Sequence, residues 1–289
     1  MKYSLIIPAY NEEKTLPEII NNFIKDSDFN SFELIFINDG STDKTREILE
    51  DFQKEKNNLK VKIINHPYNK GYGAAIKTGV RSANTDIIVL MDADGQHSVD
   101  DVLTIVERMN EFDMVIGDRG GKASPKRRNL GKWVLQRTAE FLVEKKIPDL
   151  NSGFRAFRKS KFLEFLHLYP NTFSITSTMT LAFIKAAYNI DFIPIDIKKR
   201  SEGESQVKIR DGAKTMLLLL RIIMMFNPLK VFAPVGLALL LLGLIYSIVG
   251  IALYMSFPKA GIFVSLSGLN IFFFGLIADQ LSQIRKLSD

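Results

Sequence analysis

Two carboxylates that follow a buried strand are the residues of this chain best placed to do chemistry. The apolar run 88–91 is typical of such a strand, and Asp92, Asp94 and the amide of Gln96 come directly after it. The carboxyl ends of parallel strands meet at one edge of a sheet, where α/β folds bind their ligands. Several hard oxygen donors around one point suit Mg²⁺ or Mn²⁺ holding a diphosphate. Two solvated loop acids have the same spacing, so the neighbouring segments decide the interpretation.

Three other predicted strands also end in polar segments. Each segment alone is explained by turn chemistry, and together they are Pro8–Glu13, Asn38–Asp43 and Asn69–Ala75. The carboxylate of Asp39 can accept hydrogen bonds from a nucleobase. Gly71 and Gly73 precede a predicted helix, whose amino terminus is a favourable seat for an anion. Four such segments in register at one sheet edge predict a single nucleotide-binding site.

Strand and helix patterns alternate along most of the chain. Apolar, β-branched runs predict strands at 4–8, 33–38, 61–65, 86–91 and 114–117. Helical patterns lie between them at 16–25, 43–56, 73–82 and 99–109. This alternation predicts an α/β fold with right-handed crossovers and a mostly parallel sheet.

The C-terminal part of the chain has a different composition. Residues 231–257 and 260–278 carry no Asp, Glu, Lys or Arg, and a helix of about 20 residues crosses a bilayer. We expect a transmembrane hairpin here, with two buried helices of a soluble core as the alternative. Lys230 precedes the first span and Arg285 and Lys286 follow the second. The positive-inside rule therefore places both termini in the cytoplasm.

The segment 211–229 is apolar on most sides, and the charged residues Lys214 and Arg221 interrupt its apolar surface. We expect an amphipathic helix lying in the headgroup layer, with a packing helix of the soluble part as the alternative.

Charge and cysteine content bound the remaining choices. The net charge of +6 favours anionic partners such as a nucleotide, a lipid phosphate or an acidic membrane face. The chain has no cysteine, which excludes disulfides and thiolate metal sites. We expect no nucleic-acid partner.

Residues 1–210 resemble a family 2 glycosyltransferase with the GT-A fold. The resemblance rests on four motifs in this order: Pro8–Glu12, Asn38–Asp43, Asn69–Ala75 and Asp92–His97. The later Asn151–Arg155 and the hairpin make the chain similar to the polyprenyl-phosphate glycosyltransferases, the group of dolichyl-phosphate mannose synthase and the undecaprenyl-phosphate glucosyltransferases. We therefore expect a GT-A catalytic domain at 1–210, an interfacial helix at 211–229 and the hairpin with a short tail at 230–289.

The resemblance implies three sets of site residues. The metal, Mg²⁺ or Mn²⁺, is held by Asp92, Asp94 and Gln96. The donor-binding residues are Pro8, Tyr10, Asn11, Glu12, Asp39, Lys70, Gly71, Asp92, Ala93, Asp94, Gln96, Arg200, Gln206 and Lys208. The acceptor phosphate is bound by Arg119, Lys126, Arg127, Arg128 and Ser152. The residues expected to act in catalysis are Asp94, Arg119 and Arg128.

Two departures from the family pattern concern these sets. Gln206 stands where relatives usually have a lysine, and Lys208 is the candidate replacement. Segment 173–178 offers only hydroxyls where many relatives have a glutamate, which indicates a subgroup with different sugar or acceptor contacts.

The expected reaction is the inverting, metal-dependent transfer of one sugar from a nucleotide-sugar to a polyprenyl phosphate at the cytoplasmic face of a membrane. UDP-glucose and GDP-mannose both remain as donors, undecaprenyl and dolichyl phosphate both remain as acceptors, and a homo-oligomer is expected. A processive polysaccharide synthase is the alternative, although its Gln-x-x-Arg-Trp motif is absent because Trp133 precedes Gln136. An inactive membrane scaffold of the same fold is a further alternative. A dehydrogenase is disfavoured, because Gly71-x-Gly73 lacks the third glycine of the dinucleotide fingerprint.

Overall fold

The computed structural model describes residues 2–54, 59–120, 130–196, 223–224, 227–254 and 258–287. The chain forms two compact units, residues 1–136 with 145–211 and residues 137–144 with 212–289. Several predicted residues lie outside the described ranges: Lys126, Arg127, Arg128, Arg200, Gln206 and Lys208. Most of the predicted interfacial helix 211–229 also lies outside them.

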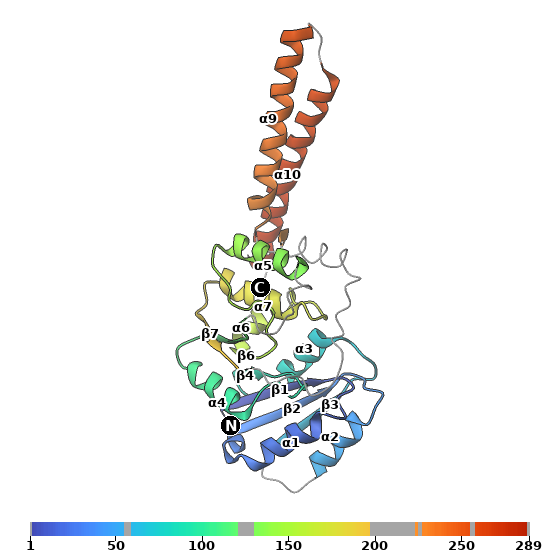
Figure 1. Ribbon diagram of the computed structural model, residues 1–289, viewed down its shortest axis with the longest axis vertical. Coiled ribbons are helices and arrows are strands. Elements are labelled where there is room, and N and C mark those ends of the chain that lie inside the picture. The colour runs from blue at the N-terminus through green and yellow to red at the C-terminus, as the bar shows by residue number, and fades with distance from the viewer. Residues whose placement is uncertain are drawn as a thin grey trace. The chain divides into compact units, whose positions relative to one another are not determined.

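A mostly parallel sheet of seven strands forms the centre of the first unit (Figure 1). Its strands are β1 (Tyr3–Ala9), β2 (Phe32–Asn38), β3 (Lys60–Asn65), β4 (Ile87–Leu90), β5 (Met114–Asp118), β6 (Arg155–Arg158) and β7 (Ile190–Pro194). Their order is β3-β2-β1-β4-β6-β5-β7, and β6 runs antiparallel to both β4 and β5. The predicted α/β fold is therefore confirmed, with β6 and β7 as additions.

The helices that follow the first four strands begin and end within two residues of their predicted positions. They are α1 (Leu16–Lys25), α2 (Thr45–Lys54), α3 (Tyr72–Ser82) and α4 (Val99–Arg108), and a 3-10 turn η1 (Ser27–Ser31) follows α1. The later helices of the first unit are α6 (Lys159–Glu164) and α7 (Ile175–Lys185), and α5 (Leu130–Val143) precedes them. A capping box between Ser98 and Asp101 fixes the start of α4.

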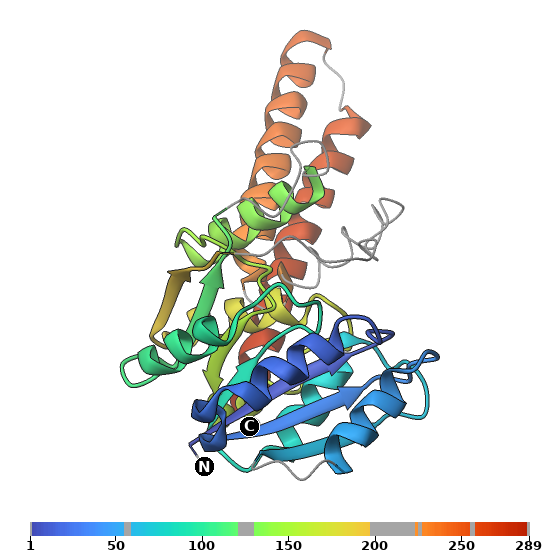
Figure 2. The same cartoon turned by 60° about the horizontal axis from the view of Figure 1, so that its bottom comes forward.

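The two faces of the sheet are covered by different helices (Figure 2). Alternate residues of the central strands, such as Leu5 and Phe36, belong to one buried cluster with the apolar faces of α1, α2 and α4. Helix α3 packs on β1 and β2, and a Cβ at its Gly79 would lie 2.5 Å from Ile6 Cγ2. Close packing on both faces holds the strand ends rigidly, which is what a site at the sheet edge requires.

The second unit contains two long apolar helices, α9 (Pro228–Tyr254) and α10 (Lys259–Leu287). Their segments Pro228–Leu253 and Lys259–Gln283 are long enough to cross a membrane, and they contain 18-residue stretches with mean hydropathies of 2.5 and 2.0, respectively. Apolar side chains such as Leu242 and Phe263 are 60% and 73% exposed. The hairpin therefore presents to its surroundings the apolar surface that suits a bilayer.

Glycines repeat every seven residues along both helices of the hairpin. They are Gly236, Gly243 and Gly250 in α9, and Gly261, Gly268 and Gly275 in α10. A Cβ at Gly236 would lie 2.7 Å from the Phe272 backbone nitrogen, and one at Gly243 would lie 2.5 Å from that of Ser265. The two helices thus approach each other so closely along these glycines that there is no room for a side chain. Small residues allow this kind of contact in pairs of membrane helices.

Candidate active site

The strand register brings the polar segments predicted from the sequence to one edge of the sheet. Ala9 pairs with Asn38, the last residue of β2, and Leu90 at the end of β4 pairs with Arg155 at the start of β6. The segments after β1, β2 and β4 therefore meet the segment before β6. The edge also receives Arg119, which directly follows β5.

The first two loops of this edge are tied to each other by hydrogen bonds. The backbone N–H of Thr42 donates to Asn11 Oδ1 at 2.8 Å, and that of Asn11 donates to Ser41 Oγ at 3.0 Å. Asn11 has a φ of 58°, in the left-handed region that asparagine tolerates better than most residues. Its side chain positions the loop, and a contact with the donor stays a prediction.

Glu12 and Ala93 are linked through the hydroxyl of Thr15. This oxygen lies 2.7 Å from the Ala93 carbonyl and 2.9 Å from Glu12 Oε2. The buried threonine therefore fixes the carboxylate loop after β4 against the loop after β1, and no sequence pattern pointed to this role.

Asp39 is only 3% exposed, and its carboxylate is surrounded by protein donors. The backbone N–H groups of Lys70 and Gly71 both donate to it at 2.9 Å. His66 Nδ1 lies 2.6 Å from Asp39 Oδ1 and donates in the tautomer that carries hydrogen there. Asp39 thereby shapes the turn in which Gly71 has a φ of 98°, a conformation that glycine adopts easily. A contact between Asp39 and a base stays a prediction.

We predicted an open anion site at the start of α3, but three of its backbone N–H groups already donate to protein acceptors, so the prediction is wrong for these three groups. Lys70 and Gly71 donate to Asp39, and the N–H of Gly73 donates to the Asn171 carbonyl at 3.0 Å. The cause is the segment before α7, which folds over this helix end and is held there by Lys77 Nζ, 2.8 Å from Asn171 Oδ1. The sequence pattern assigned no element to this segment.

The carboxylate pair lies at the end of β4, as predicted, and its members have different surroundings. Tyr72 donates its hydroxyl to Asp92 Oδ1 at 2.6 Å. Asp94 Oδ1 accepts the backbone N–H of Gln96 at 3.2 Å. Burial, with the nearby Asp92 charge, raises the pKa of Tyr72 well above its usual value of 10, so its hydroxyl keeps the proton that it donates. Within the described ranges, no three His, Asp or Glu side chains gather as a complete ligand set for a metal.

Arg119 is paired with a carboxylate that the sequence did not reveal. Its Nε and Nη2 lie 2.6 and 2.9 Å from the two oxygens of Asp149, a bidentate contact. Burial opposes ionisation of Asp149, but the bonds from Arg119 prevail and hold its pKa below the usual 3.8. Arg119 was predicted as a cation for the acceptor phosphate, and the structure shows that two of its nitrogens already serve Asp149.

Arg155 is fully buried directly behind this edge. It donates to the carbonyls of Ser152 and Thr176 and to the Thr180 hydroxyl. Burial lowers its pKa to about 10, which leaves it charged at neutral pH. Ser152, predicted to contact the acceptor phosphate, is also fully buried, and its hydroxyl lies 3.4 Å from the Phe154 carbonyl. Its carbonyl accepts a hydrogen bond from Arg155, and a contact of Ser152 with the acceptor phosphate stays a prediction.

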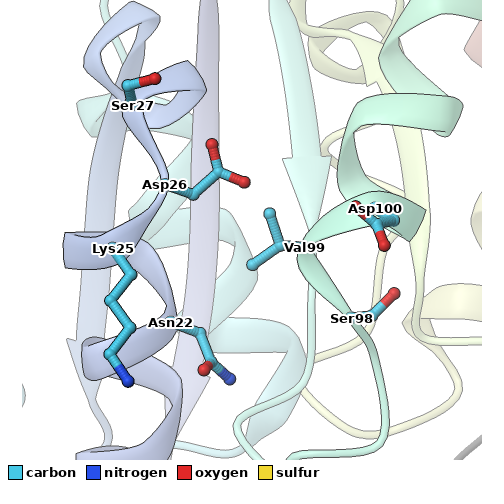
Figure 3. Close-up of a pocket in the computed structure, with 7 residues that line it drawn as sticks. All are labelled: Asn22, Lys25, Asp26, Ser27, Ser98, Val99 and Asp100. Atoms are coloured by element: carbon cyan, nitrogen blue, oxygen red, sulfur yellow. The ribbon is translucent and has the colours of Figure 1, made fainter.

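A separate open pocket lies between the C-terminal end of α1 and the N-terminal end of α4 (Figure 3). It is lined by Asn22, Lys25, Asp26, Ser27, Ser98, Val99 and Asp100. None of these is a predicted donor, acceptor or metal residue, and the pocket contributes no part of the site described above.

Two family profiles match this chain, in two separate regions. The profile described as glycosyl transferase family 2 matches residues 4–166. The profile described as the GtrB C-terminal hairpin matches residues 227–284. The first covers the sheet except for β7, and the second covers α9 and most of α10.

Two relatives and one solved structure illustrate the similarity. Glycosyltransferase AglJ of Haloferax volcanii is 27% identical, over 98% of this chain and 94% of the relative. The UDP-N-acetylglucosamine–dolichyl-phosphate N-acetylglucosaminyltransferase of Methanococcus voltae is 34% identical, over 54% of this chain and 69% of the relative. Glucosyl-3-phosphoglycerate synthase from Mycobacterium tuberculosis, in a complex with Mn²⁺, UDP and phosphoglyceric acid, has a TM-score of 0.60 at 17% identity, over 77% of each chain. At that identity the structure supports the fold alone.

Proposed function

Because this chain belongs to glycosyl transferase family 2, we propose that it transfers one sugar from a nucleotide-sugar to the phosphate of a polyprenyl phosphate. The observation that carries the proposal is the presence, in one chain, of a family 2 domain and an apolar hairpin. A hairpin in the bilayer suits an acceptor whose long hydrocarbon tail also lies there. The dolichyl-phosphate named for the Methanococcus voltae relative is an acceptor of this kind.

The donor nucleotide is proposed to bind across the loops after β1, β2 and β4. Hydrogen bonds within the protein fix these loops in advance, so little order has to be gained on binding. Tyr10, Glu12 and Asp39 are the proposed nucleoside contacts. A carboxylate at Asp39 can accept from uracil or from guanine, so UDP-glucose and GDP-mannose both remain candidate donors.

The oxygen ligands available at the end of β4 fit Mg²⁺ or Mn²⁺. Asp92 and Asp94 offer partly accessible carboxylates and Gln96 an amide, all of them hard oxygen donors. The lack of a third carboxylate within the described ranges agrees with an ion that takes its other ligands from donor phosphates and water. When bound, such an ion neutralises the charge that develops on the departing nucleotide diphosphate.

The acceptor explains why the protein need not supply a general base. A sugar hydroxyl must lose a proton as it attacks, whereas a phosphate monoester with a second pKa of roughly 6 is mostly dianionic at pH 7. A phosphate oxygen then forms the bond to the anomeric carbon while the bond to the nucleotide diphosphate breaks. Attack from the far face inverts the configuration of that carbon.

Arg119 is the proposed phosphate contact among the described residues. Asp149 fixes the plane of its guanidinium through Nε and Nη2, which leaves Nη1 to donate to a phosphate oxygen. The basic residues 126–128 and Arg200 are proposed to reduce the repulsion between the two anions. The hairpin is proposed to lie in the membrane with both termini cytoplasmic, and a homo-oligomer stays a prediction.

The test is a transfer assay with purified full-length protein in lipid nanodiscs. The protein is incubated with Mn²⁺, a polyprenyl phosphate and each of several labelled nucleotide-sugars, and the glycolipid is identified by mass spectrometry. We expect one nucleotide-sugar to give a monoglycosylated polyprenyl phosphate. Extension to a polysaccharide would support a processive synthase instead, and no product from any donor would contradict the proposed function.

A further inference from the structure

Asp92 is held on two sides by groups that take no direct part in the proposed reaction. Its Oδ1 accepts the hydroxyl of Tyr72 at 2.6 Å. Its Oδ2 lies against the backbone of Gly153, where a Cβ would lie 3.0 Å from Tyr72 Oη and still closer to the Asp92 oxygen. The carboxylate is thus confined between a phenol and a glycine, and neither flank leaves it much freedom to rotate.

The ring of Tyr72 is itself held in place by a second aromatic ring. Phe173 stacks on it with ring centroids 5.0 Å apart and an interplanar angle of 18°. The backbone beside Tyr72 is anchored by the bond from the Gly73 N–H to the Asn171 carbonyl at 3.0 Å. Tyr72 and Phe173 come from segments far apart in the sequence, so the stack forms only when the segment before α7 folds over the start of α3.

We propose that Tyr72 is a positioning residue for the metal-binding carboxylate Asp92, and that Phe173 and Gly153 complete the clamp that orients this carboxylate. The inference rests on the proposed function, because it assigns Asp92 to the metal. A group that donates to a ligating carboxylate sets its orientation, and removing such a partner typically weakens metal binding or activity about 10- to 100-fold. Tyr72 does not touch the metal or the substrate in this account.

A purely structural role for Tyr72 gives a different expectation. If the hydroxyl served only to satisfy a buried polar group, its loss would lower stability and leave the affinity for a metal unchanged. Direct metal binding therefore separates the two roles, and turnover alone does not.

The experiment compares Tyr72→Phe with a matched control, Tyr169→Phe. Both changes remove a tyrosine hydroxyl and keep the ring, but the Tyr169 hydroxyl is buried and has no hydrogen-bond partner among the described residues. Binding of Mn²⁺ alone to the full-length protein is measured from the loss of the free-ion signal in electron paramagnetic resonance. The Mn²⁺ concentration for half-maximal turnover, kcat and KM for the donor are measured beside it, and thermal unfolding checks that each variant is folded.

We expect Tyr72→Phe to weaken Mn²⁺ binding about tenfold or more. The Mn²⁺ concentration for half-maximal turnover should rise as well. The Mn²⁺ affinity of Tyr169→Phe should stay within about twofold of wild type. A second variant, Phe173→Leu, keeps the hydroxyl but removes the stack, and we expect a smaller loss in the same direction. Phe173 is 58% exposed, so its replacement removes little buried surface, and we expect this variant to fold even if Tyr72→Phe does not.

Wild-type Mn²⁺ affinity in both Tyr72→Phe and Phe173→Leu would overturn the inference and leave the transfer reaction in place. Glycolipid formation by wild-type protein at an undiminished rate after removal of divalent metal with EDTA would also overturn it, because Asp92 would then hold no metal that the reaction needs. Failure of the proposed function is recognised separately, by the absence of any glycolipid in the nanodisc assay.

Discussion

The active-site edge and the hairpin both depend on glycine, but for different physical reasons. In the hairpin, Gly243 and its heptad neighbours let one helix backbone approach another, and the spacing of seven residues repeats along both helices. At the sheet edge, Gly73 and Gly153 are not part of such a repeat. A Cβ at Gly73 would lie against the Pro170 carbonyl and the Asn171 backbone, and one at Gly153 would lie against the Asp92 carboxylate and the Tyr72 hydroxyl. A hairpin glycine therefore serves packing shared along two helices, whereas an edge glycine leaves room for the particular groups that fold against it.

The largest expected effect comes from removing chemistry without touching packing. We expect Asp94→Asn to lower kcat at least about 100-fold, because a metal-ligating charge is worth several kcal/mol in the transition state. The thermal unfolding midpoint should stay within a few degrees of wild type. Radiolabelled glycolipid formation measures the loss, and a variant that keeps most of its turnover would remove Asp94 from the proposed metal site.

The next change adds one methyl group at the active-site edge. Gly153→Ala places a Cβ against Asp92 and Tyr72, so the Asp92 carboxylate must leave the orientation in which the two flanks hold it. We expect turnover to fall about 10-fold, as for other groups that orient a ligand, with a small loss of stability. Equal losses of turnover and of folded protein would show that this glycine serves packing, like those of the hairpin.

The matching change in the hairpin is Gly243→Val. Its Cβ would lie 2.5 Å from the Ser265 nitrogen and 2.7 Å from the Gly261 carbonyl oxygen, both backbone atoms, so the helices must separate. Overpacking of this kind costs about 1–3 kcal/mol. We expect the helices to unfold at a lower denaturant concentration, as measured by circular dichroism in detergent. Turnover per folded molecule should be unchanged.

The control for this change is Leu242→Val, on a neighbouring side chain that is 60% exposed. It should unfold like wild type. If Gly243→Val also unfolds like wild type, the close approach of α9 and α10 is not what stabilises the hairpin.

The smallest effect concerns the polar pair Arg119–Asp149. The pKa of Asp149 is lower in the folded protein than its usual 3.8, so the pair stabilises the fold above that value and the stabilisation is lost as pH falls through the folded-state pKa. We expect Asp149→Asn to cost roughly 1 kcal/mol at pH 7, since the pair is partly exposed. The difference from wild type should shrink between pH 5 and pH 3, as measured by urea unfolding, and a constant difference would contradict the assignment.

Local apolar periodicity was enough to predict the first four strands and the helices that follow them. It missed β6, which has four residues and an arginine at each end, and α7, whose first half is rich in threonine and serine. In α7 these hydroxyls bond to nearby carbonyls, as Thr178 Oγ1 does to Ser174 O at 2.9 Å. A polar sequence can thus form a buried helix when its side chains are satisfied by its own backbone.

The site was predictable where strand ends carry it. The positions of Asp92 and Asp94 follow from a strand exit, which sequence shows directly. The Arg119–Asp149 pair joins residues 30 positions apart, and the bond from Tyr72 to Asp92 joins residues 20 apart; neither spacing carries a local signal. The heptad of glycines in α9 and α10 is visible in the sequence, but that the two rows face each other follows only from the folded hairpin.

The claim that a lipid phosphate is the nucleophile is tested most directly by changing only the acceptor. Wild-type protein in nanodiscs is given the accepted nucleotide-sugar and Mn²⁺, with either a polyprenyl phosphate or the same polyprenol without phosphate, and the glycolipid is quantified over time. The account predicts rapid transfer to the phosphate and none to the alcohol, because the phosphate attacks without giving up a proton and the alcohol would need a base. Transfer to the alcohol at a comparable rate would contradict it.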